Sequence, residues 1–258
     1  MVTSLELSAI YENVGEIRGW DFSALHLSEE PPPWSWEDMV RGYLTTDARV
    51  LDLGTGGGEA FSAWSEHLGR GLGIDRSEER IRVAQTDRLR RHDERLEFAL
   101  MDGSALAIRD GCMDVVLARC ADYEPAEVAR VLAPEGIFLT LQMGDNDTQN
   151  IFDVFGWGSY GSHWRARFEA QGRPYRSVPQ TAQEFQALGL QVLTYDEYNL
   201  RQYFHDIHSL VLYLKASPLP EPFDPELHAE PLTRLIADHG GAGGIETNAH
   251  RELLVVRK

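Results

Sequence analysis

The chain has 258 residues, which is enough to bury a large core, and its apolar content of 43% and charged content of 25% are ordinary for a globular protein. Its formal net charge of −17 argues against a nucleic-acid partner, because such binding gains most of its affinity from Lys and Arg contacts to phosphate. The two cysteines, Cys112 and Cys120, lack a metal-binding spacing, and neither a secretion signal nor a membrane span is visible. These features predict a cytoplasmic protein without a metal ion or disulfides.

The first strand of the predicted sheet covers residues 50–53 and is followed by a glycine-rich turn and a helix. The turn holds three alternating glycines, which permit positive φ angles and close approach of a ligand to the backbone. They are Gly54, Gly56 and Gly58. Glu59 stands where the dinucleotide fingerprint requires a further glycine, which counts against NAD, and Asp52 at the strand's carboxyl end favours a cationic ligand.

Residues 52–58, Asp-Leu-Gly-Thr-Gly-Gly-Gly, resemble motif I of the class I S-adenosylmethionine-dependent methyltransferases. By that resemblance the turn, including Thr55, wraps the amino-acid end of the cofactor, and Asp52 helps to position its ammonium group. The alternative is an ordinary turn between a strand and a helix whose glycines serve no ligand. Two acidic motifs that follow in the order typical of the family favour the methyltransferase interpretation.

The first of these motifs is Asp75, which ends the second predicted strand at residues 71–75. An acidic residue there meets the ribose hydroxyls in such folds, although a helix N-cap is its structural alternative. The second is Asp102, directly after the third strand at residues 96–100. The resemblance implies that Asp102 accepts a hydrogen bond from the adenine amine. The implied cofactor-binding set also includes Arg76, Gly103 and Ser104.

The fourth predicted strand, residues 113–118, leads to Arg119, which we expect either to contact the cofactor or substrate or to form a surface ion pair. Cys120 is expected to be a small buried residue rather than a nucleophile. No Asn-Pro-Pro-Tyr or Asp-Pro-Pro-Tyr follows, so the mark of enzymes that methylate base or protein amide nitrogens is absent. The segment 130–136, Arg-Val-Leu-Ala-Pro-Glu-Gly, is typical of the family and precedes strand five at residues 137–142.

Two segments outside these motifs are expected to surround the substrate. Residues 1–47 are acidic and rich in aromatic residues, which predicts an ordered N-terminal cap. Its aromatics either pack on the core or line a pocket, and the family resemblance implies that Trp20 contacts the cofactor. The irregular insertion at about 145–180, with four arginines, is expected to form a substrate lid or a solvated loop within the domain of residues 48–258.

The remaining sequence predicts helices and strands that complete the sheet. They are a helix at 181–188, strand six at 190–198, an apolar helix at 203–215, a helix at 226–238 and strand seven at 251–258. Asp206 is expected to cap the apolar helix. The candidates for a catalytic base are His163, His205 and His208, because the pKa of histidine lies near neutrality, but their spacing does not complete a metal ligand set.

Together these patterns predict an α/β fold with a Rossmann-like seven-stranded, mostly parallel sheet, helices on both faces, an N-terminal cap and a substrate lobe built from insertions. The resemblance implies an S-adenosylmethionine-dependent methyltransferase that moves a methyl group to an O or N atom of a small molecule. One alternative is an RNA methyltransferase, which would need a basic face at the cofactor mouth. Another is a non-catalytic cofactor-binding protein with its methyl site blocked, for example by Trp20 or Arg119. The sequence does not specify the methyl acceptor, the catalytic base or the oligomeric state.

Overall fold

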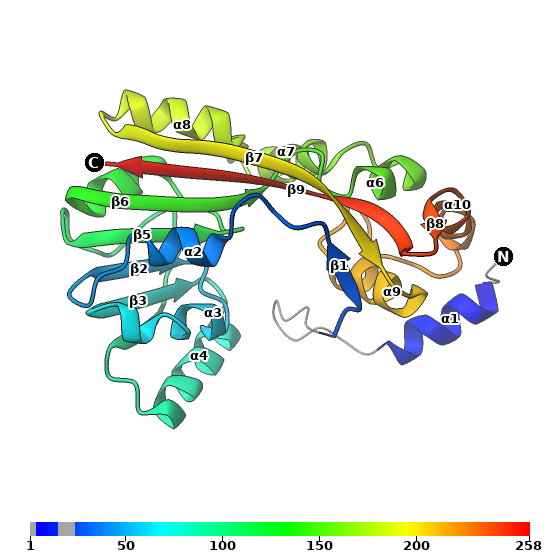
Figure 1. Cartoon of the computed structure of the whole chain (residues 1–258), viewed down its shortest axis with the longest axis horizontal. Coiled ribbons are helices and arrows are strands. Elements are labelled where there is room, and N and C mark those ends of the chain that lie inside the picture. The colour runs from blue at the N-terminus through cyan, green and yellow to red at the C-terminus, as the bar shows by residue number, and fades with distance from the viewer. Residues whose placement is uncertain (1–3, 15–23) are drawn as a thin grey trace. The chain divides into compact units, whose positions relative to one another are not determined.

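The computed structural model describes residues 4–14 and 24–258 (Figure 1). The chain forms two compact units, each built from three separate segments. Unit 1 consists of Met1–Pro33, Met143–Ser177 and Tyr198–Arg251, and unit 2 consists of Trp34–Gln142, Val178–Glu197 and Glu252–Lys258. The expected division into a cap of residues 1–47 and a domain of residues 48–258 stays a prediction, and it differs from these units because residues 34–47 belong to unit 2.

Seven strands of the sheet follow the order β7-β9-β6-β5-β2-β3-β4, and of these β2, β3, β4 and β5 lie wholly in unit 2. The strands are β2 (Arg49–Leu53), β3 (Arg70–Asp75), β4 (Leu96–Leu100), β5 (Met113–Arg119), β6 (Leu132–Met143), β7 (Gln191–Phe204) and β9 (Gly244–Arg257). The pairs β2–β3, β2–β5, β3–β4 and β5–β6 are parallel. Their carboxyl ends therefore meet at one edge of the sheet, which is where ligands bind in open α/β folds.

Helices cover both faces of this sheet. The side chains of neighbouring strand residues point to opposite faces and enter different cores. In β2, Val50 belongs to the core on one face and Leu51 to the core on the other. The helices of unit 2 are α2 (Trp36–Arg41), α3 (Glu59–Ser62), α4 (Glu78–Arg91), α5 (Pro125–Val131) and α8 (Val178–Ala187), with a short 3₁₀ turn at Ser65–His67. Of these, α4 lies beside β3 and β4 (Figure 1).

The predicted α/β fold with a mostly parallel sheet is confirmed, but in the described residues the sheet has nine strands instead of seven. The two additional strands are β1 (Leu27–Glu29) and β8 (Gly240–Gly241). Segments of three and two residues are too short to show an alternating pattern, so the sequence gives no signal for them. In unit 1, β1 pairs antiparallel with β7 and β8 pairs antiparallel with β9.

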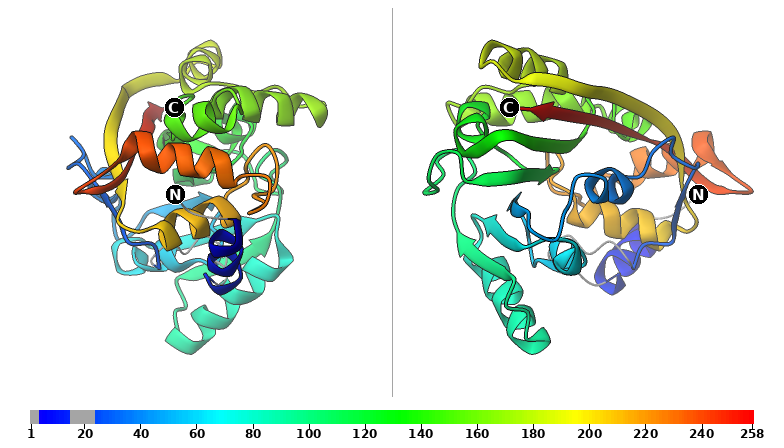
Figure 2. Two further views of the ribbon diagram at one scale, coloured as in Figure 1. Left: turned by 90° about the vertical axis from the view of Figure 1, so that its right-hand side faces the viewer. Right: turned by 60° about the vertical axis from the view of Figure 1, so that its left-hand side comes forward.

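Unit 1 also contains five helices among the described residues, with α1 beside α9 and α10 beside α6 (Figure 2). They are α1 (Ser4–Asn13), α6 (Gln149–Phe155), α7 (Tyr160–Ala170), α9 (Ile207–Ala216) and α10 (Ala229–His239). The expectation that residues 145–180 are irregular is wrong, since α6 and α7 lie there. The start of α7 is a capping box made by Ser159 and Ser162, with serine where glutamate or glutamine is the usual signal.

The C-terminal boundaries also shift by a few residues from the prediction. The expected helix at 203–215 begins only at Ile207, because β7 continues to Phe204. Asp206 caps α9 as predicted, and its Oδ1 accepts a hydrogen bond from the Ser209 N–H at 2.7 Å. Across the described ranges no helix is long and apolar enough to cross a membrane. The cytoplasmic location stays a prediction.

A buried polar cluster follows β6 in unit 1. Asp147 is 2% exposed, forms an ion pair with Arg251 and accepts from the His250 N–H at 2.9 Å. Burial raises the pKa of Asp147, and the Arg251 charge opposes this effect. Gly144 donates its N–H to the His250 carbonyl at 2.9 Å, so the loop after β6 lies directly against β9.

We expect Gly144→Ala to lower the free energy of unfolding by about 1–3 kcal/mol, because a Cβ there would overlap with the His250 ring. Gly241→Ala is the matched control in the same unit, since a Cβ at Gly241 meets nothing within 4 Å. Urea unfolding of both variants measures the difference. Equal stability of the two variants would show that the His250 ring moves aside freely.

Candidate cofactor-binding site

The turn after β2 has the left-handed backbone geometry that its glycines predict. The φ angles of Gly54, Gly56 and Gly58 are +70°, +60° and +78°. A Cβ at Gly54 would lie 2.5 Å from the Ala121 Cβ, and one at Gly58 would lie 2.8 Å from the Phe98 ring, whereas a Cβ at Gly56 would meet nothing within 4 Å. Close packing therefore explains two of the glycines, and the third borders open space that a ligand can fill.

Asp52 lies near the carboxyl end of β2 and is 9% exposed. The pKa of this carboxyl is raised to about 7, chiefly by burial and also by the Asp75 charge. The Thr55 hydroxyl and the Arg119 charge act in the opposite direction. A buried carboxyl with a raised pKa favours a cationic ligand, because a positive group beside it stabilises the ionised form. The residue thus fits the ammonium group that the resemblance assigns to it.

Asp75 ends β3, is 6% exposed and is held by two backbone donors. Its Oδ2 accepts from the Gly56 N–H at 3.1 Å and its Oδ1 from the Ser77 N–H at 2.8 Å. Arg80 approaches Oδ2 at 3.8 Å. The N-cap of α4 is Ser77, whose Oγ accepts from the Arg80 N–H at 3.4 Å, so capping does not account for Asp75.

Asp102, Gly103 and Ser104 follow β4 and form a compact turn. Asp102 is exposed, and its Oδ1 accepts from the Ser104 N–H at 2.8 Å and from the Ser104 hydroxyl at 2.7 Å. A Cβ at Gly103 would lie 2.6 Å from the Asp122 carbonyl oxygen, so only glycine fits between the loops that follow β4 and β5. The structure therefore brings the second acidic motif to the same edge as Asp52 and Asp75.

Two exposed ion pairs cross this edge within unit 2. Arg119 lies 3.5 Å from Glu37 of α2, which is the surface ion pair that the sequence left open as an alternative. Arg76 lies 3.7 Å from Asp122. The acidic partners were missed by sequence reasoning. Asp122 stands in the acidic segment after β5, and that position could have indicated an acidic partner at this edge. Nothing in the sequence relates Glu37 to Arg119.

Cys120 is exposed, so the prediction that it is a small buried residue is wrong. Its φ angle is +50°, and its N–H donates to the Leu141 carbonyl at 2.8 Å. This left-handed residue directly follows the last residue of β5 and turns the chain out of the sheet. Its side chain consequently lies outside the sheet, in which residues 115–118 of β5 are buried.

The remaining predicted residues are Trp20 and the three histidines. Trp20 is outside the described residues. The three histidines belong to unit 1, where His163 Nε2 lies 2.9 Å from the Pro218 carbonyl and His205 Nδ1 lies 3.0 Å from the Gly243 carbonyl. Burial lowers the pKa of His163, and His208 is exposed on α9. Their role as a base stays a prediction.

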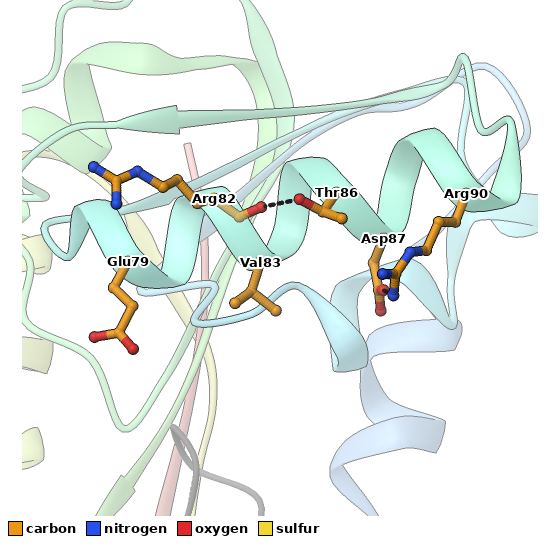
Figure 3. Close-up of a pocket in the computed structure, with 6 residues that line it drawn as sticks. All are labelled: Glu79, Arg82, Val83, Thr86, Asp87 and Arg90. Atoms are coloured by element: carbon orange, nitrogen blue, oxygen red, sulfur yellow. Dashed lines mark hydrogen bonds and ion pairs between the residues drawn. The ribbon is translucent and has the colours of Figure 1, made fainter.

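A hollow on the surface of α4 is not part of this site (Figure 3). All of its lining residues come from that one helix, and the Thr86 hydroxyl donates to the Arg82 carbonyl at 2.7 Å. Convergent polar groups from several elements, which are typical of a binding site, are missing among these residues. In the part of the chain that the structure describes, no group of three or more His, Cys, Asp or Glu side chains could hold a metal ion.

Comparison with known proteins shows which domain this site resembles. Residues 50–136 match the family model of a methyltransferase domain. The uncharacterized methyltransferase YcgJ of Bacillus subtilis (strain 168) is 33% identical over 98 residues, which are 35% of this chain and 39% of that protein. The ubiquinone/menaquinone biosynthesis C-methyltransferase UbiE of Acidiphilium cryptum (strain JF-5) is 29% identical over 137 residues, 50% of each protein. The chain thus spans half or less of the length of these curated relatives.

Solved structures show the same fold over a larger part of the chain. The structure of YcgJ from Bacillus subtilis has a TM-score of 0.57 at 19% identity and covers 86% of this chain and 97% of its own. The [4+2]-cyclase SpnF has a TM-score of 0.56 at 16% identity and covers 100% of this chain and 93% of its own. At these identities the likeness concerns the fold alone.

The fold is Rossmann-like, as in the solved structure of YcgJ. Within it, residues 50–136, which include the glycine turn, are similar to a methyltransferase domain.

We expect Gly56→Ala to weaken binding of S-adenosylmethionine at least about tenfold, because the new Cβ enters the open space beside the turn. Gly111→Ala is the matched control. Gly111 has a φ of +65° and likewise has no atom within 4 Å of its Cβ position, so it carries the same backbone strain away from the turn. Calorimetric titration compares the two variants, and an equal loss in both would attribute the effect to strain.

Binding of the cofactor should also depend on pH through Asp52. Since burial raises the pKa of Asp52 to about 7, the carboxyl is largely protonated below that pH and must lose its proton to pair with an ammonium group. We expect the Kd to fall about fivefold to tenfold between about pH 6 and about pH 7.5, below the pH at which an α-amino group loses its own proton. Asp52→Asn should abolish this change. An unaltered pH profile in the variant would exclude Asp52 as its source.

Proposed function

We propose that the chain binds S-adenosylmethionine at the carboxyl edge of the unit 2 sheet and transfers its methyl group to an O or N atom of a small molecule. The observation that carries this proposal is the succession of Asp52, Asp75 and Asp102 near the carboxyl ends of three adjacent parallel strands, beside open space at Gly56. The methyltransferase domain match covers the same three carboxylates.

The groups at this edge are suited to the parts of the cofactor that the resemblance assigns to them. Asp52 supplies a buried carboxylate for the ammonium group, and its low exposure strengthens that attraction. Asp75 has oxygens with further acceptor capacity, because each holds only one backbone N–H, and ribose hydroxyls can donate to it. Asp102 is exposed after β4 and can accept from the adenine amine.

The bound cofactor supplies an activated methyl group, so the protein's task is to align an acceptor and exclude water. A base is required only when the acceptor atom carries a proton. His163 and His205 each contact a carbonyl oxygen, which can only accept, so Nε2 of His163 and Nδ1 of His205 carry the hydrogen. Burial lowers the pKa of His163, which favours its neutral form.

A small molecule suits the edge of unit 2 better than RNA does. Five carboxylates lie at this edge, and three of them pair with arginines: Asp122 with Arg76, Glu37 with Arg119 and Asp75 with Arg80. The other two are Asp52 and Asp102. An acidic mouth repels a polyphosphate chain. The Acidiphilium relative is named as a C-methyltransferase, so a carbon acceptor is the main competitor of the proposed O or N acceptor.

Calorimetric titration with S-adenosylmethionine, S-adenosylhomocysteine and NAD tests the cofactor. We expect micromolar binding of the first two and none of NAD. Asp75→Ala should weaken binding by about one to two orders of magnitude, because it removes a charged acceptor and the anchor of the Gly56 N–H. Asp87→Ala, which removes an exposed carboxylate on α4, is the control and should have no effect. Unchanged affinity in Asp75→Ala would remove Asp75 from the site.

The acceptor atom can be identified with S-adenosylmethionine labelled with carbon-13 in its methyl group. After incubation with a panel of small hydroxyl, amine and carbon-acid compounds, the chemical shift of the transferred methyl distinguishes O, N and C products. A C-methyl product would replace the proposed O or N acceptor, and transfer to RNA alone would favour the alternative.

A further inference from the structure

The surface of α7 is positively charged, although the chain as a whole is strongly acidic. Residues 160–176 hold four arginines and one carboxylate, a formal charge of +3, so the remaining residues carry −20 to give the net charge of −17. Arg165 and Arg167 are exposed on α7, and neither forms an ion pair with any of the described residues. A negatively charged partner can therefore reach both guanidinium groups.

Aromatic rings hold the arginines of this surface in place. Three guanidinium groups lie over three rings, at 4.9–5.5 Å from the ring centres: Arg165 over Tyr175, Arg167 over Trp164 and Arg173 over Phe168. Contacts of this kind occur about once per 70–80 residues in proteins, so three of them within residues 164–175 are a concentrated group. A guanidinium that rests on a ring has already lost part of its rotamer freedom, and binding to it costs less entropy. We call these six residues the arginine surface.

Residues 221–230, which precede and begin α10, form an acidic segment in the same unit. The segment contains four carboxylates and no lysine or arginine. Just before α7 begins, the Trp157 Nε1–H donates to the Glu221 Oε1 at 2.9 Å. Within α7, the His163 Nε2 lies 2.9 Å from the Pro218 carbonyl oxygen. The arginine surface and the acidic segment are therefore neighbours in unit 1.

The acidic segment matches the arginine surface in both charge and apolar contact. Glu226 and Glu230 are exposed, and among the described residues neither forms an ion pair. Leu227 lies between them in sequence and is 73% exposed. An exposed leucine flanked by carboxylates fits the partly exposed rings of Trp164 and Phe168, which are flanked by arginines. An apolar centre with a charged rim is the usual composition of a protein interface.

We propose that two copies of this chain associate through these surfaces, with the arginine surface of each copy against the acidic segment of the other. A unit that carries both surfaces is self-complementary, because a two-fold axis sets each positive surface against a negative one and makes the contact twice. Charge complementarity identifies a second copy as the occupant, since outside the arginine surface this chain is itself an acidic protein. The inference goes beyond the proposed function, because neither surface contains a residue assigned to the cofactor.

Sedimentation equilibrium of the wild-type chain tests the association. We expect a dimer, with twice the chain mass of 29.1 kDa, when the protein is at micromolar concentration in low salt. Dimerisation should weaken at least about tenfold between about 0.1 M and about 1 M NaCl, because the screening length falls from about 10 Å to about 3 Å. A wild type that is monomeric at both salt concentrations would overturn the proposal.

Charge reversal tests which surfaces meet. Arg165→Glu with Arg167→Glu sets carboxylates against carboxylates, and Glu226→Lys with Glu230→Lys sets lysines against arginines. Each double variant alone should be monomeric, with a dimer Kd raised at least about hundredfold. A mixture of the two variants should form a dimer, because every contact then joins opposite charges. This mixed dimer would also show that both variants are folded.

Two further variants complete the experiment. Arg82→Glu with Arg90→Glu on α4 makes the same change in net charge outside the interface and should remain dimeric. Leu227→Ser leaves the charge unchanged and should raise the dimer Kd about tenfold, because it removes the apolar centre. Dissociation of the α4 variant would attribute the effect to net charge. That result overturns the proposed pairing, as does a mixture that stays monomeric while circular dichroism shows both variants folded.

Discussion

The hydrogen bond from the Gly56 N–H to the buried Asp75 carboxylate is the interaction on which the cofactor site depends. It joins the turn after β2 to the end of β3, so the left-handed backbone of the turn and the acidic side chain fix each other. The parallel pairing of the two strands makes this contact possible, because both chains end at the same edge of the sheet. A single bond thereby orders two of the three regions proposed to hold the ligand.

Two buried carboxyls at one edge create an electrostatic strain that a cationic ligand relieves. The charge of Asp75 adds to burial in raising the pKa of Asp52, whereas Asp75 itself is supported by two N–H groups. The environments of the two residues therefore differ. Asp52 is the group whose protonation we expect to respond to a cationic ligand, and Asp75 holds the Gly56 N–H of the turn.

Sequence patterns were sufficient where the determining contacts are local. The strand, glycine turn and helix around residues 50–60, the acidic ends of β3 and β4, and the Asp206 cap all depend on neighbours within a few residues. The patterns failed where the partner is distant, as for the Arg119–Glu37 and Arg76–Asp122 pairs, or where an element is as short as β1. The burial of Cys120 was predicted wrongly, because its left-handed φ exposes the side chain and a cysteine does not indicate such a φ.

The family match at residues 50–136 lies wholly within unit 2, whereas unit 1 is assembled from three stretches that are separate in the chain. No single gene segment encodes unit 1, so recombination at one crossover cannot exchange it for the corresponding part of a relative. Changes in that unit must instead accumulate as independent substitutions, insertions and deletions in its three stretches. In such a lineage the glycine turn can stay recognisable while the rest of the chain diverges beyond sequence comparison.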